Sequence, residues 1–248
     1  MHNYYYYFSI PYLCEIYKSS VPGFTLIFAS ILLMDTVWRH PFSAVVAGPS
    51  MAGKSSFVRR LIENRKEMIH PSPNRVYWCY AEEQPMYATL LADPDVTFVQ
   101  GFPDISEAQG ALLIFDDLMM ESKDNPFLTA LATRGCHHRN ISCIQIVQNL
   151  FFGGRTARIN SQYIVLMKNP ADKLQVATLA RQLFPDNTKY FKEAYEDATR
   201  KPHGYLLLDL GQATPDHTRQ RTCIFPGEVT IVYTPINRGT WKCTNHQY

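Results

Sequence analysis

The sequence of 248 residues carries little net charge, which excludes a protein that is basic or acidic throughout. Its 24 lysines and arginines nearly balance its 22 aspartates and glutamates, so the formal net charge is +2. A highly charged partner such as nucleic acid therefore has to be bound by a local patch, a loop or a ring of subunits. The apolar fraction of 46% and charged fraction of 19% exclude a disordered or fibrous chain and suit one globular core.

The chain also lacks the cysteine pattern of a disulfide framework. Its six cysteines are scattered and form no CxxC pair. Cys79 and Cys143 lie within apolar, strand-like runs, where a small buried thiol is expected. The stretch Cys136-His137-His138 has no second ligand pair at zinc-binding spacing, so a metal site is not favoured there. The cysteine usage predicts a reducing, intracellular setting.

No hydrophobic run is long enough to span a membrane. Residues 21–34 form a mostly apolar run of fourteen residues that ends at Asp35, whereas a membrane helix needs about 20. The run resembles the core of a signal peptide, but a basic flank and a small-x-small cleavage site are missing. We expect no stable membrane insertion. Three interpretations of residues 1–40 stay open: a helix packed on the domain, an accessory extension, or a segment outside the mature protein, which would begin at Met34.

From Phe42 onward, strand-like and helix-like segments alternate. Short apolar runs predict strands at 42–47, 74–80, 96–100, 111–115, 141–147, 163–168 and 205–210. Helical periodicity predicts helices at 54–68, 127–133, 171–184 and 188–198. This alternation predicts an α/β domain over 41–226 with a mainly parallel sheet flanked by helices. The tail, 227–248, is weakly periodic and stays unassigned.

A complete phosphate-binding motif follows the first predicted strand. The fixed positions of G-x-x-x-x-G-K-[ST] are met by Gly48-Pro49-Ser50-Met51-Ala52-Gly53-Lys54-Ser55. In this motif the backbone N–H groups turn toward phosphate oxygens, the lysine contacts the β- and γ-phosphates, and the serine hydroxyl is a ligand for Mg²⁺. The motif lies between a strand and an amphipathic helix, as its chemistry requires. We include Ser56 in the predicted ATP-binding set.

Two acids end the apolar run of residues 111–115. Because this run predicts a strand buried on both faces, its last residues should lie at the carboxyl edge of a parallel sheet, beside the phosphate loop. Asp116 is predicted to hold Mg²⁺, directly or through water. Asp117 is predicted to polarise the attacking water as a general base.

A third set of polar residues surrounds the predicted strand at 141–147. Gln148 and Asn149 end that strand, where an amide can sense the γ-phosphate or orient water, or simply cap the strand. The loop before the strand contains Arg134 and Arg139. These arginines have three open roles: acting in trans on the γ-phosphate of a neighbouring subunit, contacting DNA phosphate, or facing solvent.

Taken together, these motifs resemble the FtsK/HerA superfamily of P-loop ATPases, and within it the genome-packaging ATPases of the poxvirus type and of Maverick/Polinton elements. The resemblance covers about residues 38–226. It is carried by the phosphate loop, the acid-ended strand, and the stretches 134–142, 148–149, 163–170 and 202–210. The chain departs from the pattern at Asp117, where many members have glutamate, and this weakens the assignment of the base.

The resemblance implies a RecA-like (ASCE-type) core that binds ATP and Mg²⁺ between the subunits of a homo-oligomeric ring. It implies double-stranded DNA as the partner, driven into a preformed capsid, and hence contact with capsid proteins. It also implies a location in the nucleus or cytoplasm of a host cell, or in the virion.

Two other functions use a phosphate loop and stay open at this point. A nucleoside or small-molecule kinase usually has an arginine-rich lid and an acceptor pocket, where this chain has Asp116 and Asp117. A nucleotide-dependent switch with little turnover would not need this pair of acids. DNA-stimulated release of phosphate would separate the motor from both.

Overall fold

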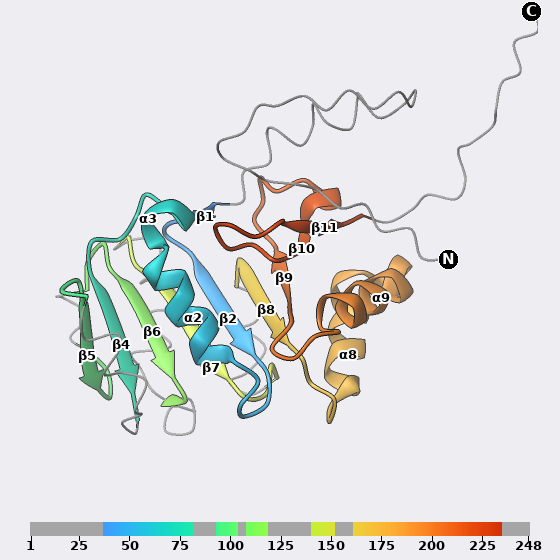
Figure 1. Cartoon of the computed structure of the whole chain (residues 1–248), viewed down its shortest axis with the longest axis horizontal. Helices are drawn as coiled ribbons and strands as arrows, with labels where there is room; N and C mark the ends of the chain where they lie inside the picture. The colour runs from blue at the N-terminus through green and yellow to red at the C-terminus, as the bar shows by residue number, and fades with distance from the viewer. Residues whose placement is uncertain (1–36, 82–92, 104–107, 119–139, 152–160, 235–248) are drawn as a thin grey trace, which may run out of the picture.

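The computed structural model describes residues 37–81, 93–103, 108–118, 140–151 and 161–234. These residues form a sheet of nine strands in the order β11-β10-β9-β8-β2-β7-β6-β4-β5 (Figure 1). Its parallel part consists of β8 (Tyr163–Met167), β2 (Ser43–Ala47), β7 (Ser142–Val147), β6 (Leu112–Asp116), β4 (Val76–Tyr80) and β5 (Val96–Gln100). The predicted α/β fold with a mainly parallel sheet is therefore confirmed.

Three antiparallel strands extend the sheet beyond β8. They are β9 (Tyr205–Asp209), β10 (Gln220–Thr222) and β11 (Ile231–Tyr233). Strand β10 is polar in sequence and was not predicted, yet all three of its residues are buried. Arg221 on β10 is buried because its Nη2 donates to Asp209 Oδ2 on β9 at 2.9 Å. Strand β11 lies in the unassigned tail, and the predicted domain limits at 40 and 226 stay a prediction.

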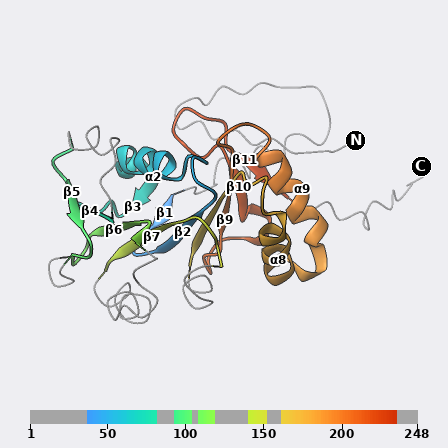
Figure 2. The ribbon, with the colours of Figure 1, turned by 90° about the horizontal axis from the view of Figure 1, so that it is seen from below.

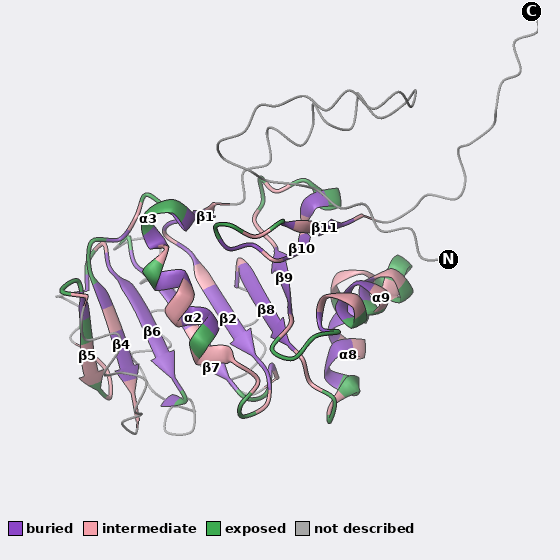
Figure 3. Cartoon of the chain, in the orientation of Figure 1, coloured by how far each residue is buried: buried purple, intermediate pink, exposed green. Residues whose placement is uncertain are grey.

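Helices cover both faces of the sheet. Helix α2 (Lys54–Glu63) packs Phe57 and Leu61 against Ala44 and Val46 of β2. On the other face of the sheet, α8 (Lys173–Leu183) and α9 (Thr188–Ala198) pack together. They cover Val45 and Ala47, the residues of β2 that alternate with Ala44 and Val46. Figure 2 shows α2 over the parallel strands and α8 beside α9 near β9. Because side chains alternate across a strand, β2 is buried on both faces. Figure 3 shows its neighbour β8 buried as well, and also β6, which lies on the far side of β7.

One predicted helix is divided in two. The helix expected over 54–68 is broken at Asn64, so that α2 ends at Glu63 and the short α3 spans Arg65–Met68. The Asn64 side chain donates from Nδ2 to the Arg60 carbonyl at 2.8 Å, and its backbone N–H points to the same carbonyl. This local bonding by an asparagine side chain competes with helix continuation. After the break, α3 leads into the short strand β3 (Ile69–His70), which pairs in parallel with β1 (Trp38–Arg39).

Several predictions fall outside the described residues. They concern the apolar run at 21–34, the helix at 127–133, and the two arginines Arg134 and Arg139. Among the described residues, no helix is both long and apolar enough to cross a membrane.

Candidate nucleotide site

The phosphate loop connects β2 to α2, and two of its glycines have steric reasons to be glycine. A Cβ on Gly48 would lie 2.7 Å from the Cβ of Met167, a residue on the neighbouring strand β8. Gly53 has φ of +95°, and a Cβ there would lie 3.2 Å from the ring of His203. Any larger residue at either position would displace the loop. The loop is thus held closely between the end of β8 and the turn before β9.

The remaining residues of the predicted binding set lie at the start of α2 and are mostly exposed or half-buried. Met51 has φ of +62° and is 94% exposed, while Ser50 and Ser56 are exposed and Ala52 is half-buried. The Pro49 carbonyl accepts from the Ala52 N–H at 3.2 Å and from Lys54 Nζ at 3.0 Å. Lys54 is the first residue of α2, so its backbone N–H also belongs to the positive end of that helix. Backbone N–H groups and an ammonium group together suit a phosphate.

The lysine lies within a field set by two acids. Burial lowers the pKa of the Lys54 ammonium group, and the carboxylates of Asp117 and Asp116 partly oppose this shift by raising the pKa. Lys54 and these acids are far apart in sequence. They lie close together in the fold because β2 and β6 are both parallel to β7, so that their carboxyl ends lie at the same edge of the sheet. The structure therefore brings the predicted phosphate loop and the predicted acids together.

Ser55 and Asp116 form a set of oxygen ligands suited to Mg²⁺. The Ser55 hydroxyl donates to Asp116 Oδ2 at 3.4 Å, and Asp116 is only 5% exposed at the end of β6. A hydroxyl and a carboxylate are the kinds of oxygen ligand that Mg²⁺ takes beside the phosphates of a nucleotide. The two residues predicted to hold the metal therefore fit it.

Asp117 and Gln148 are brought together as well. Gln148 follows β7, the strand that lies between β2 and β6, and its Nε2 donates to Asp117 Oδ2 at 3.1 Å. Asp117 has a left-handed backbone with φ of +56°, which is uncommon for a residue other than glycine and often accompanies a functional position. Both side chains are exposed, so water can reach them. The neighbouring Asn149 instead accepts from Phe151 N–H at 2.8 Å, as a residue that caps a turn does.

His203 is a contact to the phosphate loop that the sequence did not reveal. Its Nδ1 lies 3.3 Å from the Ala52 carbonyl, where an N–H on that nitrogen can donate. The next residue, Gly204, has no room for a side chain, because a Cβ would lie 2.6 Å from the Ala198 carbonyl. This tight turn after α9 fixes where His203 lies. The sequence pointed to this region only through the resemblance of the stretch 202–210, which assigned no role to His203.

The structure describes the start of strand β7, which follows the two predicted arginines in the sequence. Arg134 and Arg139 lie outside the described residues, which resume at Asn140. Since β7 is parallel to β2, Asn140 lies at the edge of the sheet opposite the phosphate loop. Within the described part of the chain, no cluster of three or more histidine, cysteine or acidic side chains could hold a metal ion. The stretch Cys136-His137-His138 is outside that part.

Comparisons with known proteins agree with this architecture. No protein-family model matches the sequence, and no curated protein matches it. Among solved structures, the chain is similar to the genome packaging NTPase B204 of Sulfolobus turreted icosahedral virus 2 in complex with ATP-gammaS, with 13% identity and a TM-score of 0.51. That match covers 79% of this chain and 98% of the other.

A second solved structure has the same arrangement. It is B204, the DNA-packaging ATPase from Sulfolobus turreted icosahedral virus, with 13% identity, a TM-score of 0.50, and coverage of 79% of this chain and 99% of the other. At this level of identity the similarity establishes the fold and no more. The chain therefore has the fold of the P-loop ATPases, as the resemblance in its motifs implied.

Proposed function

We propose that this chain is a Mg-dependent ATP hydrolase that works as a homo-oligomeric motor on double-stranded DNA. The observation that carries the proposal is the pairing of two contacts beside the phosphate loop, Ser55 with Asp116 and Gln148 with Asp117. The first pair suits a metal ion and the second suits a water molecule. A phosphate loop next to both is suited to hydrolysis rather than to simple binding.

The five polar side chains of the site divide the chemistry between them in this proposal. Ser55 and Asp116 would hold Mg²⁺, which when bound neutralises charge on the phosphate oxygens. Lys54 binds the β- and γ-phosphates. Asp117 takes a proton from the attacking water, and the amide of Gln148 holds the Asp117 carboxylate in place.

The substrate of the motor is proposed from the resemblance of the motifs and from the fold. Two solved structures that share this fold carry names that describe genome or DNA packaging. We propose the same kind of work here, the movement of a viral or virus-like genome into capsids, with capsid proteins as further partners. The proposal places the protein inside the host cell, in the nucleus or cytoplasm, or in the virion. The free thiols of Cys79, Cys143 and Cys223 fit a reducing compartment.

DNA dependence of hydrolysis tests this function. We expect linear duplex DNA to raise the kcat for ATP by about tenfold, equivalent to about 1.4 kcal/mol of barrier, because a motor couples hydrolysis to its track. Phosphate release would be measured with Mg-ATP, with and without duplex DNA, and with heparin as a polyanion control. A kcat for ATP that is the same with and without duplex DNA would contradict the motor. No hydrolysis under any condition would favour the kinase or the switch.

A mixing experiment tests the subunit ring. Asn140, the first described residue before β7, lies at the edge of the sheet opposite the phosphate loop. We propose on this ground that an arginine preceding it in the sequence acts on a neighbour's nucleotide rather than on its own. Such a cation in trans can contribute about 10³ in rate. We expect mixtures of Lys54→Ala subunits with Arg139→Ala or Arg134→Ala subunits to recover activity that each lacks alone. Mixed assemblies that stay inactive would assign the arginine to DNA, to its own site or to no catalytic role.

A further inference from the structure

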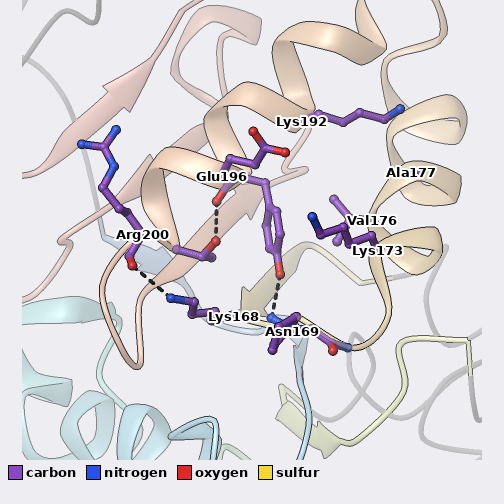
Figure 4. Close-up of a pocket in the computed structure, with 11 residues that line it drawn as sticks. Lys168, Asn169, Lys173, Val176, Ala177, Lys192, Glu196 and Arg200 are labelled. Carbon is purple, nitrogen blue, oxygen red and sulfur yellow. Dashed lines mark hydrogen bonds between the residues drawn. The ribbon is translucent and has the colours of Figure 1, made fainter.

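A cleft of about 620 Å³ lies outside the nucleotide site, between the end of β8 and the two helices α8 and α9 (Figure 4). Lys168, Asn169 and Pro170 form its rim where β8 ends, Lys173 and Val176 line it from α8, and Lys192, Tyr195 and Glu196 line it from α9. Because α8 and α9 cover the face of the sheet opposite α2, the cleft is separate from the phosphate loop. Its volume is within the range of small-ligand sites.

The charge of this cleft is predominantly positive. Lys168, Lys173, Lys192 and Arg200 line it together with one acid, Glu196. Arg200 already forms an ion pair with Asp197. Within the residues that the structure describes, Lys173 and Lys192 have no ion-pair partner, and both are exposed. Two lysines therefore border the cleft without a counter-charge of their own.

The walls of the cleft are held in place before any ligand binds. Tyr195, which is buried, donates from its hydroxyl to the Met167 carbonyl at 3.0 Å and accepts from the Asn169 N–H at 2.9 Å. Lys168 Nζ donates to the Arg200 carbonyl at 3.0 Å and so ties the end of β8 to the end of α9. Figure 4 shows the contact of Lys168 with Arg200 and the contact of the Asn169 N–H with the tyrosine hydroxyl. A preformed site loses less conformational freedom on binding than a site that has to be ordered.

We propose that this cleft binds phosphate groups and is a second anion site, distinct from the nucleotide site. Lysine is a point charge that suits phosphate without requiring the paired geometry of arginine. The phosphate groups can belong to the backbone of duplex DNA or to a free polyphosphate. The DNA source rests on the proposed function, whereas the site itself rests only on the cleft and its charges.

Lysine footprinting tests the site directly. The full chain would be acetylated with a limiting reagent, alone, with a 30-base-pair duplex or with tripolyphosphate, and the modified lysines quantified by mass spectrometry. The Lys54→Ala protein serves here, so that tripolyphosphate bound at the phosphate loop contributes little. We expect several-fold less acetylation of Lys173 and Lys192 with either ligand. Lys189, whose side chain is 88% exposed on the same helix α9, serves as the internal control and should not change.

Paired variants then test whether these lysines contribute to binding. Lys173→Gln with Lys192→Gln would be compared with Lys66→Gln with Lys189→Gln, which removes equal charge at exposed positions elsewhere. We expect the first pair to weaken binding of a fluorescein-labelled duplex and to reduce the slope of log affinity against log salt by about two. The control pair should leave that slope nearly unchanged.

The outcomes separate this site from the proposed motor. Protection of Lys173 and Lys192 by tripolyphosphate, without binding of duplex, supports the phosphate site and removes DNA as its source. The site is overturned, and the motor is not, by two results together. Both variant pairs bind duplex with equal affinity, and neither ligand protects Lys173 and Lys192 from acetylation. DNA stimulation of ATP hydrolysis is measured separately. Its absence contradicts the motor and leaves the conclusion from lysine acetylation unchanged.

Discussion

Replacing Lys54 with alanine is expected to lower kcat for ATP by at least about 100-fold, which corresponds to about 2.7 kcal/mol of lost transition-state stabilisation. Its ammonium group lies at the start of α2, partly buried, and donates a hydrogen bond to the Pro49 carbonyl of the same loop. It is therefore positioned for phosphate rather than for the support of distant parts of the fold.

The measurement is steady-state phosphate release at saturating Mg-ATP, together with a thermal melt of each protein. Lys66→Ala is the matched control, because Lys66 is exposed on α3, outside the phosphate loop. We expect both variants to melt within a few degrees of the parent. A well-folded Lys54→Ala protein that kept more than about a tenth of the parent's turnover would remove the basis for the nucleotide site.

The second large effect concerns the two neighbouring acids, Asp116 and Asp117. We expect their replacement by asparagine to impair different steps, nucleotide binding in one case and hydrolysis in the other. Asp116→Asn should weaken Mg-dependent binding of ATP, because Asp116 is buried beside Ser55 and would hold the metal. Asp117→Asn should leave ATP affinity within about twofold but lower kcat by about 10²–10⁴, the usual contribution of a general base.

Equilibrium titration with a fluorescent ATP analogue, with and without Mg²⁺, measures the first effect, and single-turnover hydrolysis measures the second. Asn149→Ala is a useful control, since the Asn149 side chain accepts from the Phe151 N–H and caps a turn next to Gln148. Equal loss of nucleotide affinity in both aspartate variants would show that the division of roles between metal and water is wrong.

The arrangement of the candidate nucleotide site was largely predictable, because its parts are short motifs at strand ends. The loop from Gly48 to Ser55 and the acids after β6 each follow an apolar run, and parallel strands necessarily bring their carboxyl ends to one edge. The contact of Gln148 with Asp117 follows from the same rule, because β7 lies between β2 and β6. The precise chemical roles of these residues stay predictions.

Other features could not be predicted because they depend on distant partners. Strand β10 has a polar sequence, and its burial becomes favourable only when Arg221 meets Asp209 across the sheet. The break at Asn64 depends on one side-chain bond that periodicity does not detect. His203 reaches the Ala52 carbonyl from 151 positions away, and only the folded chain brings the two together.

The turn that carries His203 has a thermodynamic consequence. It touches the phosphate loop at Ala52, and Arg200, three residues earlier, receives the bond from Lys168 at the rim of the cleft. A ligand that shifts this turn changes the affinity of the loop for nucleotide. Linkage then requires nucleotide to change the affinity for that ligand by the same factor. Under the proposed function, this linkage would let the chain hold its ligand tightly in one nucleotide state and loosely in the next, so that each round of hydrolysis would alternate binding with release.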